Sequence, residues 1–232
     1  YPLEVHLCKS CGLSQLTYTV SPEVLYRNDY PYESSITKTG DKHWANFANS
    51  IIHKFGLSEN DMVVDIGSNV GTLLSKFKNK GIKVQGIDPA ANIVLIAQSQ
   101  GIDTICDFFN EECVQKIINT KSNAKVITAT NCFAHVDNLN EFMLNIKTLL
   151  ADDGVFIFES PHIKNLIQKN EYDTIYHEHL SYLSLKPLIN FAKKFDMKIF
   201  DVYESDIHGG SFRVFFCNKD TYDTTANIEK ML

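Results

Sequence analysis

The stretch VVDIGSNVG, residues 63–71, decides the fold of this chain. An apolar run of valine and isoleucine that ends in Asp-x-Gly is typical of a buried strand turning sharply into a helix, because glycine accepts backbone angles and close approach that other residues resist. A ligand can then lie against bare backbone where the helix begins. The stretch therefore predicts a ligand-binding turn that carries Asp65, Gly67, Asn69 and Gly71.

A second apolar run, VQGIDP at residues 84–89, ends in Asp88 and Pro89. A carboxylate at the tip of a strand is placed to accept two hydrogen bonds from the hydroxyl groups of a ribose. The two runs together predict a nucleoside pocket.

The spacing of the glycines indicates which nucleoside. A dinucleotide fold uses G-x-G-x-x-G so that a pyrophosphate can sit on the helix N-terminus, whereas here position 69 is Asn and three residues separate Gly67 from Gly71. Asp65 lies just before the turn, where a carboxylate would repel a phosphate but could orient a cationic amino-acid group. S-adenosylmethionine, a nucleoside that carries an amino acid and a sulfonium, fits both conditions.

Length and composition exclude several classes of protein. The chain has 232 residues, enough for one sizeable α/β domain with small attachments. A net charge of -6 and a pI near 5.7 argue against a nucleic acid as the main partner. No apolar run approaches the roughly 20 residues that cross a bilayer. Six cysteines show no disulfide-like pattern beyond one pair and no secretory leader is visible, so we expect a cytoplasmic protein. The sequence does not indicate its oligomeric state.

Apolar periodicity predicts alternating strands and helices through the middle of the chain. The expected elements are helices at 44–55, 90–100 and 139–150 and strands at 63–66, 84–88, 104–106, 125–129 and 154–159. This alternation predicts an α/β fold with a doubly wound, mostly parallel sheet. Ligands gather outside the carboxyl ends of the strands in such sheets, which is where Asp107 and Asn131 also fall.

The run Cys-Lys-Ser-Cys-Gly near the start of the chain has the spacing of a zinc knuckle. A structural zinc takes four ligands, and Cys8 and Cys11 supply two. The chain begins at Tyr1 rather than Met, which leaves room for an upstream pair. Two interpretations stay open: half of a zinc site, or two free thiols at a frayed end.

A second group of polar residues lies at 172–182, YDTIYHEHLSY. Two histidines, a glutamate and several hydroxyl groups in one short run predict that at least one of them carries a proton during a reaction. A solvated loop is the simpler interpretation. A metal site is a third, because residues two apart in an extended segment share a face and His208 could join His177 and His179.

The pattern at 65–71 together with Asp88 resembles the first two motifs of Rossmann-like (class I) S-adenosylmethionine-dependent methyltransferases. Within this class the chain resembles one family, the sugar C-methyltransferases, and the resemblance covers nearly the whole chain. Members of that family act on nucleotide-linked keto-deoxysugars and carry an N-terminal zinc-binding module. The runs that carry it are CKSCGL at 8–13, YPYESS at 30–35, DIGSNVG at 65–71, NCFAH at 131–135, YHEH at 176–179 and HGGSFR at 208–213.

The resemblance implies roles for particular residues. His179 is the expected general base, with Glu178, Tyr176, His135 and Tyr30 around the sugar. The expected cofactor contacts are Asp65, Gly67, Asn69, Gly71, Asp88, Pro89, Asp107, Phe108 and Asn131. The expected substrate contacts are Tyr32, His177, His208 and Arg213, and the zinc ligands are Cys8 and Cys11 if an upstream cysteine pair exists.

The chemistry of a keto-sugar suits these residue types. A carbon beside a ketone is acidic enough for a base of near-neutral pKa to deprotonate, and histidine is the side chain whose unperturbed pKa lies there. Hydroxyl and imidazole groups aimed at the ketone oxygen would stabilise the enolate, whose carbon then attacks the sulfonium methyl. The acceptor is thus expected to be a small molecule, a sugar nucleotide.

Two alternatives remain, because relatives continue past the position of Leu232 into a further domain. One is an O- or N-methyltransferase that acts on a building block of a surface polysaccharide. The other is a catalytically silent cofactor-binding subunit. In either case we expect residues 1–40 to form an N-terminal appendage, a remnant of the zinc-binding module followed by a substrate loop, and residues 41–232 to form the methyltransferase domain.

Overall fold

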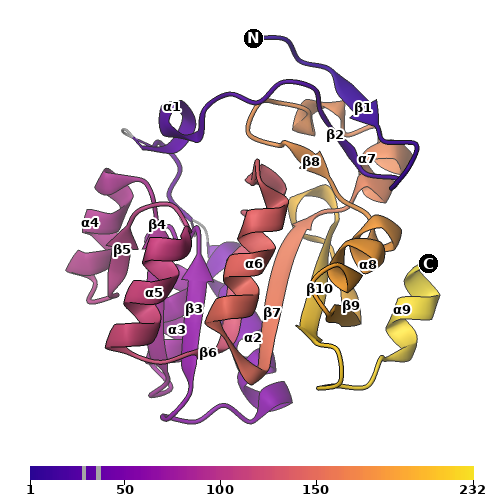
Figure 1. Cartoon of the computed structure of the whole chain (residues 1–232). Coiled ribbons are helices and arrows are strands. Elements are labelled where there is room, and N and C mark those ends of the chain that lie inside the picture. Colours follow the sequence, from indigo (N-terminus) through magenta and orange to yellow (C-terminus); the bar gives the residue numbers. More distant parts are fainter. Residues whose placement is uncertain (28–29, 35–37) are drawn as a thin grey trace. The chain divides into compact units, whose positions relative to one another are not determined.

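The computed structural model describes residues 1–27, 30–34 and 38–232, apart from the side chains of Lys38, Thr39 and His208. Ten strands form two sheets in this part of the chain (Figure 1). The larger sheet has, in spatial order, β5 (Thr104–Cys106), β4 (Lys83–Asp88), β3 (Met62–Ile66), β6 (Ala124–Thr130), β7 (Leu150–Pro161), β10 (Ser211–Asn218) and β9 (Met197–Ser205). The smaller sheet has β1 (Val5–Leu7), β2 (Ser14–Leu16) and β8 (Ser181–Tyr182). The predicted α/β fold with a mostly parallel, doubly wound sheet is confirmed.

The chain packs as two compact units. The first unit comprises Tyr1–Ser21, Ala129–Lys147 and Asp152–Leu232, and the second comprises Pro22–Thr128 and Thr148–Ala151. The predicted boundary at residue 40 separates a zinc-module remnant and substrate loop from the methyltransferase domain, whereas these units are defined by compactness. The boundary therefore stays a prediction.

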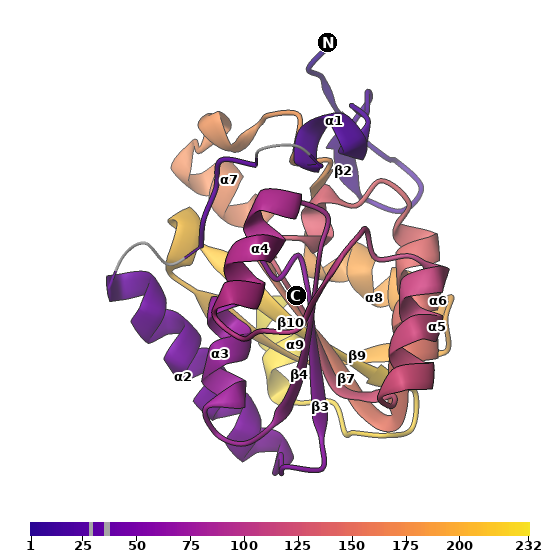
Figure 2. The ribbon, with the colours of Figure 1, turned by 90° about the vertical axis from the view of Figure 1, so that its left-hand side faces the viewer.

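Parallel pairing organises the second unit. β3 pairs with β4 on one side and β6 on the other, and β4 pairs with β5. Every residue of β3 is buried, as expected for a central strand covered on both faces. Helices α2 (Lys38–Phe55) and α3 (Thr72–Lys78) lie on one face of these strands and α5 (Glu111–Thr120) on the other (Figures 1 and 2). α1 (Pro22–Tyr26) and α4 (Ala91–Ser99) complete this unit.

The helix after β3 begins at a glycine for a steric reason. Gly71 has φ +78°, a left-handed conformation, and a Cβ built on it would lie 2.9 Å from Cγ1 of Ile102. Residues other than glycine are disfavoured by that backbone angle and by the packing of Ile102. The second glycine of the 65–71 motif is therefore required by the fold itself, whatever it also does for a ligand.

Antiparallel pairing organises the first unit. β10 pairs antiparallel with both β7 and β9. Its core is aromatic: the rings of Phe133 and Phe158 stack with centroids 4.7 Å apart, and Phe156, Phe212 and Phe216 are fully buried. The helices that lie wholly within this unit are α7 (Ile163–Lys169), α8 (Leu185–Lys193), α9 (Ala226–Met231) and the short 3-10 turns η1 (Phe133–His135), η2 (Tyr172–Thr174) and η3 (Ile207–Gly209).

The predicted elements match the structure in kind, with three corrections. The helix expected at 44–55 begins earlier, because α2 starts at Lys38. The sheet continues beyond the strand expected at 154–159, since the unpredicted strands β10 and β9 follow β7 in it. α5 went unpredicted, although Asn110 caps it by accepting from the Cys113 N–H at 2.8 Å and two glutamates follow, which are ordinary signals of a helix start. α6 (Leu139–Leu149) agrees with the prediction.

Within the described ranges, none of the helices has both the length and the apolar character needed to cross a membrane.

Candidate functional site

The turn after β3 is tied to the end of β4. The N–H groups of Gly67 and Ser68 donate to the carbonyl of Ile87 at 2.8 and 3.1 Å. The N–H of Asn69 donates to Oδ2 of Asp88 at 2.9 Å. Gly67 and Asn69 both have positive φ, which aims successive N–H groups at this strand end. The two motifs that the sequence singled out therefore form one rigid structure within the second unit.

Asp88 is the buried carboxylate at the centre of that structure. It is 6 % exposed, and Oδ1 accepts a further hydrogen bond from the N–H of Ala90 at 3.0 Å. Burial raises its pKa, while the hydrogen bonds from Ala90 and Asn69 oppose the rise. A carboxylate oxygen can accept two hydrogen bonds, and each oxygen of Asp88 accepts one here, so both keep a lone pair for the hydroxyl groups of a ribose.

Asp65 has a different environment from the one its sequence position suggested. Its side chain is buried, and Oδ1 lies 2.6 Å from the hydroxyl of Thr128. The pKa of Asp65 is raised to about 7, mainly by burial; the hydrogen bond from Thr128 opposes this rise and the nearby charge of Asp88 contributes to it. At neutral pH the carboxyl group is thus only partly ionised, so it is a weaker partner for a cation than expected.

The residues of this edge fit a polar nucleoside ligand by a test that does not depend on the carboxylates. The hydroxyl of Ser68 is buried and has no hydrogen-bond partner among the described residues. Gly86 leaves room for it, since a Cβ there would lie 2.6 Å from Oγ of Ser68 and 2.7 Å from Oγ1 of Thr104. Buried polar atoms normally have partners, so an unpartnered hydroxyl beside the predicted cofactor turn favours a bound polar group.

The third predicted cofactor loop follows β5. Asp107 accepts from Nη2 of Arg27 at 3.1 Å, and the guanidinium of Arg27 also lies 5.0 Å from the ring centre of Phe108. Tyr30, predicted among the catalytic residues, and Tyr32, a predicted substrate contact, belong to the same unit and are held there by asparagine side chains. The second unit thus brings together all predicted cofactor residues except Asn131, which lies in the first unit.

His179 has a defined tautomer. Its Nδ1 lies 2.7 Å from the carbonyl oxygen of Thr174, which can only accept, so Nδ1 carries the proton. Its Nε2 lies 2.9 Å from the hydroxyl of Tyr176, which donates to it when the ring is neutral. The lone pair of the neutral imidazole is therefore on Nε2, where it accepts from the Tyr176 hydroxyl. Thr174 was not predicted as a site residue, because a backbone carbonyl leaves no signal in the sequence.

His135 stands beside His179 but differs from it chemically. The two ring centres are 5.0 Å apart with their planes at 49°. Although part of its surface stays accessible, burial lowers the pKa of His135 to about 3, and the neighbouring charge of His179 contributes to the shift. His135 is neutral at physiological pH. It can donate or accept a hydrogen bond there, but it is a weak base.

His177 and Glu178 complete the YHEH run. Nε2 of His177 lies 3.2 Å from the carbonyl of Pro2, and its ring meets the edge of Tyr1 at 6.1 Å. This histidine is thus joined to the N-terminal segment, while Glu178 lies between His177 and His179 in the turn after η2.

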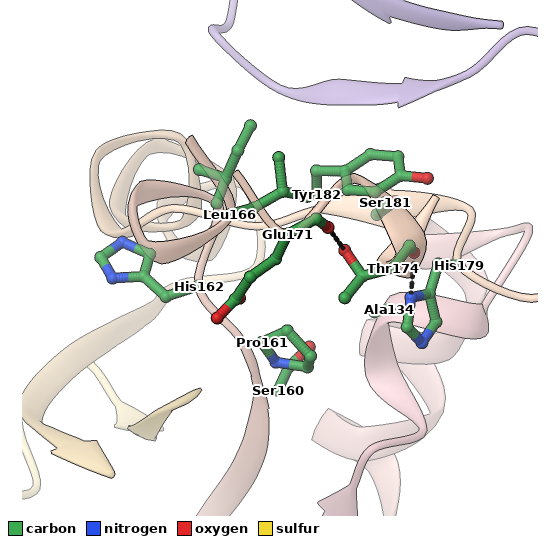
Figure 3. Close-up of a pocket in the computed structure, with 11 residues that line it drawn as sticks. Ala134, Ser160, Pro161, His162, Leu166, Glu171, Thr174, His179, Ser181 and Tyr182 are labelled. Atoms are coloured by element: carbon green, nitrogen blue, oxygen red, sulfur yellow. Dashed lines mark hydrogen bonds between the residues drawn. The ribbon is translucent and has the colours of Figure 1, made fainter. Parts of the chain in front are cut away.

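A small pocket of about 20 Å³, partly open to solvent, is lined in part by His179 and lies within the first unit (Figure 3). Figure 3 shows Glu171 between Tyr182 and Leu166 on one side and Ser160 and Pro161 on the other. The lining includes three buried polar atoms without a partner among the described residues, which are Oγ of Ser160, Nδ1 of His162 and the hydroxyl of Tyr182. Unpartnered buried polar atoms are rare and mark places where a ligand or water binds.

Arg213, a predicted substrate residue, forms a buried ion pair. Its Nε and Nη2 donate to Oε2 of Glu159 at 3.0 and 2.7 Å, and Glu159 is fully buried. Arg213 therefore neutralises the charge of Glu159 through this ion pair. Gly210 has φ +129°, and a Cβ added there would collide with Nδ2 of Asn165, which explains the second glycine of the HGGSFR run. The side chain of His208 falls outside the described part of the chain.

Cys8 and Cys11 lie in an exposed turn of the first unit. The N–H of Cys8 donates to the carbonyl of Leu13 and the N–H of Gly12 donates to the carbonyl of Cys8, both at 2.8 Å. Hydrogen bonds from Cys11 lower the pKa of the Cys8 thiol. Such a turn favours thiolate and suits a metal, but two ligands do not make a site. Among the described residues, no three histidine, cysteine or acidic side chains are grouped so that they could hold a metal ion.

The fold and these residues define an S-adenosylmethionine-dependent methyltransferase domain of the Rossmann-like class. Residues 41–202 match a protein family described as a methyltransferase domain, and the chain belongs to that family.

Two curated relatives are C-methyltransferases by name. The chain is 35 % identical over 215 residues to the C-methyltransferase NovU of Streptomyces niveus, a match that covers 93 % of this chain and 51 % of that protein. It is 30 % identical over 133 residues to the sterol 4-C-methyltransferase strm-1 of Caenorhabditis elegans, covering 56 % of this chain and 38 % of that protein. The chain spans about half the length of the curated relatives it matches.

Solved methyltransferases share the fold. An S-adenosylmethionine-dependent methyltransferase from Clostridium acetobutylicum matches with a TM-score of 0.59 at 14 % identity, covering 76 % of this chain and 91 % of that one. The plantazolicin methyltransferase BamL, solved with a triazolic desmethylPZN analogue and SAH, matches with a TM-score of 0.60 at 14 % identity, covering 79 % of this chain and 87 % of that one.

Proposed function

We propose that the chain is the cofactor-binding and proton-abstracting part of a C-methyltransferase that adds a methyl group to a nucleotide-linked keto-deoxysugar. The single observation that carries the proposal is the tautomer of His179, whose Nε2 offers a lone pair beside the Tyr176 hydroxyl. The 35 % identity to a protein named C-methyltransferase supports carbon as the acceptor atom. The sugar is inferred from the motifs at 30–35, 176–179 and 208–213.

The proposed reaction starts with His179. Its Nε2 takes the proton from the carbon beside the ketone, and the C–H electron pair becomes the enolate. Rotation of the Tyr176 hydroxyl from Nε2 towards the ketone oxygen would free the lone pair and place a donor where negative charge develops. Bound S-adenosylmethionine supplies a methyl group already activated by its sulfonium.

The other residues bind and orient. Asp88 would hold the ribose hydroxyl groups of the cofactor, and the backbone at Gly67 would lie against its amino-acid part. Neutral His135 would donate a hydrogen bond to the acceptor, because its lowered pKa keeps it from acting as the base. The unpartnered Ser160 and Tyr182 hydroxyls in the pocket beside His179 are suited to hydroxyl groups of a sugar.

Two other functions are distinguishable by product. An O- or N-methyltransferase would use the same base on a hydroxyl or an amine, and a silent subunit would bind cofactor without turnover. The ordered His179 and Tyr176 pair argues against silence. A cytoplasmic location, a small-molecule acceptor and the zinc site remain predictions.

The deciding experiment supplies methyl-labelled S-adenosylmethionine and a panel of nucleotide-linked keto-sugars, and locates the new methyl group by NMR. A methyl group on the carbon beside the ketone is the expected result. A methyl group on oxygen or nitrogen would establish the second function instead.

A further inference from the structure

A strap precedes α2 in the second unit; we use the word for residues 22–27 and 30–34, the described part of that segment. It contacts the turn after β3, the first turn of α4 after β4, and the loop after β5. Figure 2 shows residues 30–34 beside α4. These three segments carry or adjoin the predicted cofactor contacts, so the strap and the cofactor would share their supports.

Asn92 holds the strap at Tyr30. The Tyr30 N–H donates to Oδ1 of Asn92 at 3.3 Å, and Nδ2 of Asn92 donates to the Tyr30 carbonyl at 3.0 Å. One side-chain amide thus satisfies both backbone polar groups of a residue that belongs to no helix or strand. Asn92 lies in the first turn of α4, directly after the predicted cofactor contacts Asp88 and Pro89.

Asn69 holds the strap at a second point. The N–H of Ser34 donates to its Oδ1 at 2.7 Å, and its Nδ2 donates to the carbonyl of Tyr32 at 2.9 Å. The backbone N–H of the same residue donates to Asp88. Asn69 is 8 % exposed, so these hydrogen bonds are largely shielded from water. The strap is therefore bound to the residue that also fixes the predicted ribose carboxylate.

Two further contacts orient the strap. The ring of Tyr30 packs on an apolar cluster of Val70, Ala90 and Ile93, which lies at the same strand ends. Arg27 forms the ion pair with Asp107 after β5. Both asparagines and Arg27 thus connect the strap to the supports of the cofactor and not to the outer surface of the sheet.

We infer that Asn92 is a positioning residue of the reaction: it fixes Tyr30 relative to the cofactor loops and so sets the place of the acceptor. The inference rests on the proposed function, since the role of Tyr30 at the acceptor comes from it. Asn92 itself contacts none of the predicted cofactor residues through its side chain in the described hydrogen bonds. It is therefore a cleaner probe than Asn69, whose loss would also disturb Asp88.

The kinetic test compares Asn92→Ala with the wild-type protein. Two hydrogen bonds to Tyr30 are lost, so KM for the keto-sugar should rise about 10-fold, with a lower kcat. The Kd for S-adenosylhomocysteine should change less than about 3-fold. Asn92→Gln keeps the amide and should recover part of the loss. The inference would be overturned by an unchanged KM for the keto-sugar in Asn92→Ala, or by an equal rise in that KM and in the Kd for S-adenosylhomocysteine.

The matched control is Asn123→Ala. Nδ2 of Asn123 donates to the carbonyls of Thr148 and Leu149 at 3.1 and 3.3 Å, also in the second unit, but at the amino end of β6. It removes comparable side-chain hydrogen bonds and should alter the melting temperature without altering KM. If Asn92→Ala and Asn123→Ala shift the melting temperature alike and neither shifts KM, Asn92 is merely structural.

A second measurement is independent of the acceptor. Amide hydrogen exchange followed by mass spectrometry should be at least about 10-fold faster in peptides covering residues 30–34 of Asn92→Ala, with β3 peptides unchanged. Unchanged exchange would overturn the inference even in an active enzyme. A wild-type protein that methylates no keto-sugar, yet shows this change in exchange, would instead overturn the proposed function and leave the hold on Tyr30 established.

Discussion

The Nδ1–H of His179 donates a hydrogen bond to the carbonyl of Thr174, and this one hydrogen bond determines which nitrogen of the ring can act as a base. Because the carbonyl accepts only, the neutral ring keeps its lone pair on Nε2, where the Tyr176 hydroxyl lies 2.9 Å away. The YHEH run thus contains one histidine with a prepared basic nitrogen and another, His177, that is joined to Pro2.

The first prediction concerns this base. His179→Ala should lower the methylation rate by roughly 10²–10⁴-fold, because proton transfer loses its acceptor, while the affinity for S-adenosylhomocysteine barely changes. Tyr176→Phe should cost less, since it removes a donor and not the base. With S-adenosylhomocysteine in place of the methyl donor, a keto-sugar deuterated at the attacked carbon should lose its label to water only when His179 is present. A His179→Ala protein of near wild-type rate would move the base to another residue.

The second prediction concerns the pH dependence of stability. The folded pKa of His135, about 3, lies below its ordinary value of 6.5, so the unfolded chain binds a proton that the folded protein refuses. The contribution of His135 to the free energy of unfolding should therefore be fully present above pH 6.5. It should fall by about 1.4 kcal/mol per pH unit as the pH is lowered from 6.5 towards 3.

His135→Asn isolates this contribution. Between pH 7 and pH 5 the variant should gain about 2 kcal/mol relative to wild type in urea unfolding, whatever its stability at pH 7. Asp65 acts in the opposite sense, because its pKa is raised from 3.8 to about 7 and its contribution is lost as the pH rises through that range. A pH-independent difference between His135→Asn and wild type would contradict the assignment of a neutral His135.

The third prediction concerns the cofactor. Asp88→Asn keeps one acceptor oxygen but loses the other and the charge, so binding of S-adenosylhomocysteine should weaken by about 1 to 3 kcal/mol, measured by calorimetry. Asp61→Asn is the control, since Asp61 caps Ser58 in an exposed turn of the same unit. An unchanged affinity in Asp88→Asn would remove the ribose assignment, and tight binding of NAD would remove the class of ligand.

The fourth prediction separates packing from backbone strain. Gly71→Ala should lower the free energy of unfolding by about 2 to 4 kcal/mol, because the new Cβ meets Ile102 in a left-handed backbone conformation. Gly81→Ala has a similar φ, +83°, with no atom within 4 Å of the new Cβ, so it should cost about 1 to 2 kcal/mol. Equal losses in chemical denaturation would show that the contact with Ile102 contributes nothing.

The fifth prediction concerns the cysteine turn. Cys8 is exposed and the pKa of its thiol is lowered, so it should react with iodoacetamide near neutral pH faster than Cys106, which is exposed but lies outside the turn. Burial raises the pKa of Cys113 and that of Cys217, so these two buried thiols should react more slowly than both exposed ones. Mass spectrometry of the alkylated peptides measures this order. In a longer protein that includes a further cysteine pair, added zinc should protect Cys8 from alkylation. If zinc does not slow the alkylation of Cys8 in that protein, the free-thiol interpretation holds.

The sequence by itself determined the parallel half of the fold and the cofactor turn. The strand at 63–66, the turn at Gly67 and Gly71 and the acid at Asp88 are local signals: apolar runs, glycines at forced backbone angles and a carboxylate at a strand end. Such signals act between neighbours in the chain, and they are legible without knowledge of the fold.

Tertiary structure alone decided the chemical state of the site. The pKa of Asp65 near 7 and that of His135 near 3 come from burial by segments distant in sequence. The tautomer of His179 depends on a backbone carbonyl, and the hold of Asn92 on Tyr30 joins residues 62 positions apart. Solvent exclusion and hydrogen-bond partners are properties of the folded surroundings, so no pattern in the chain could predict them.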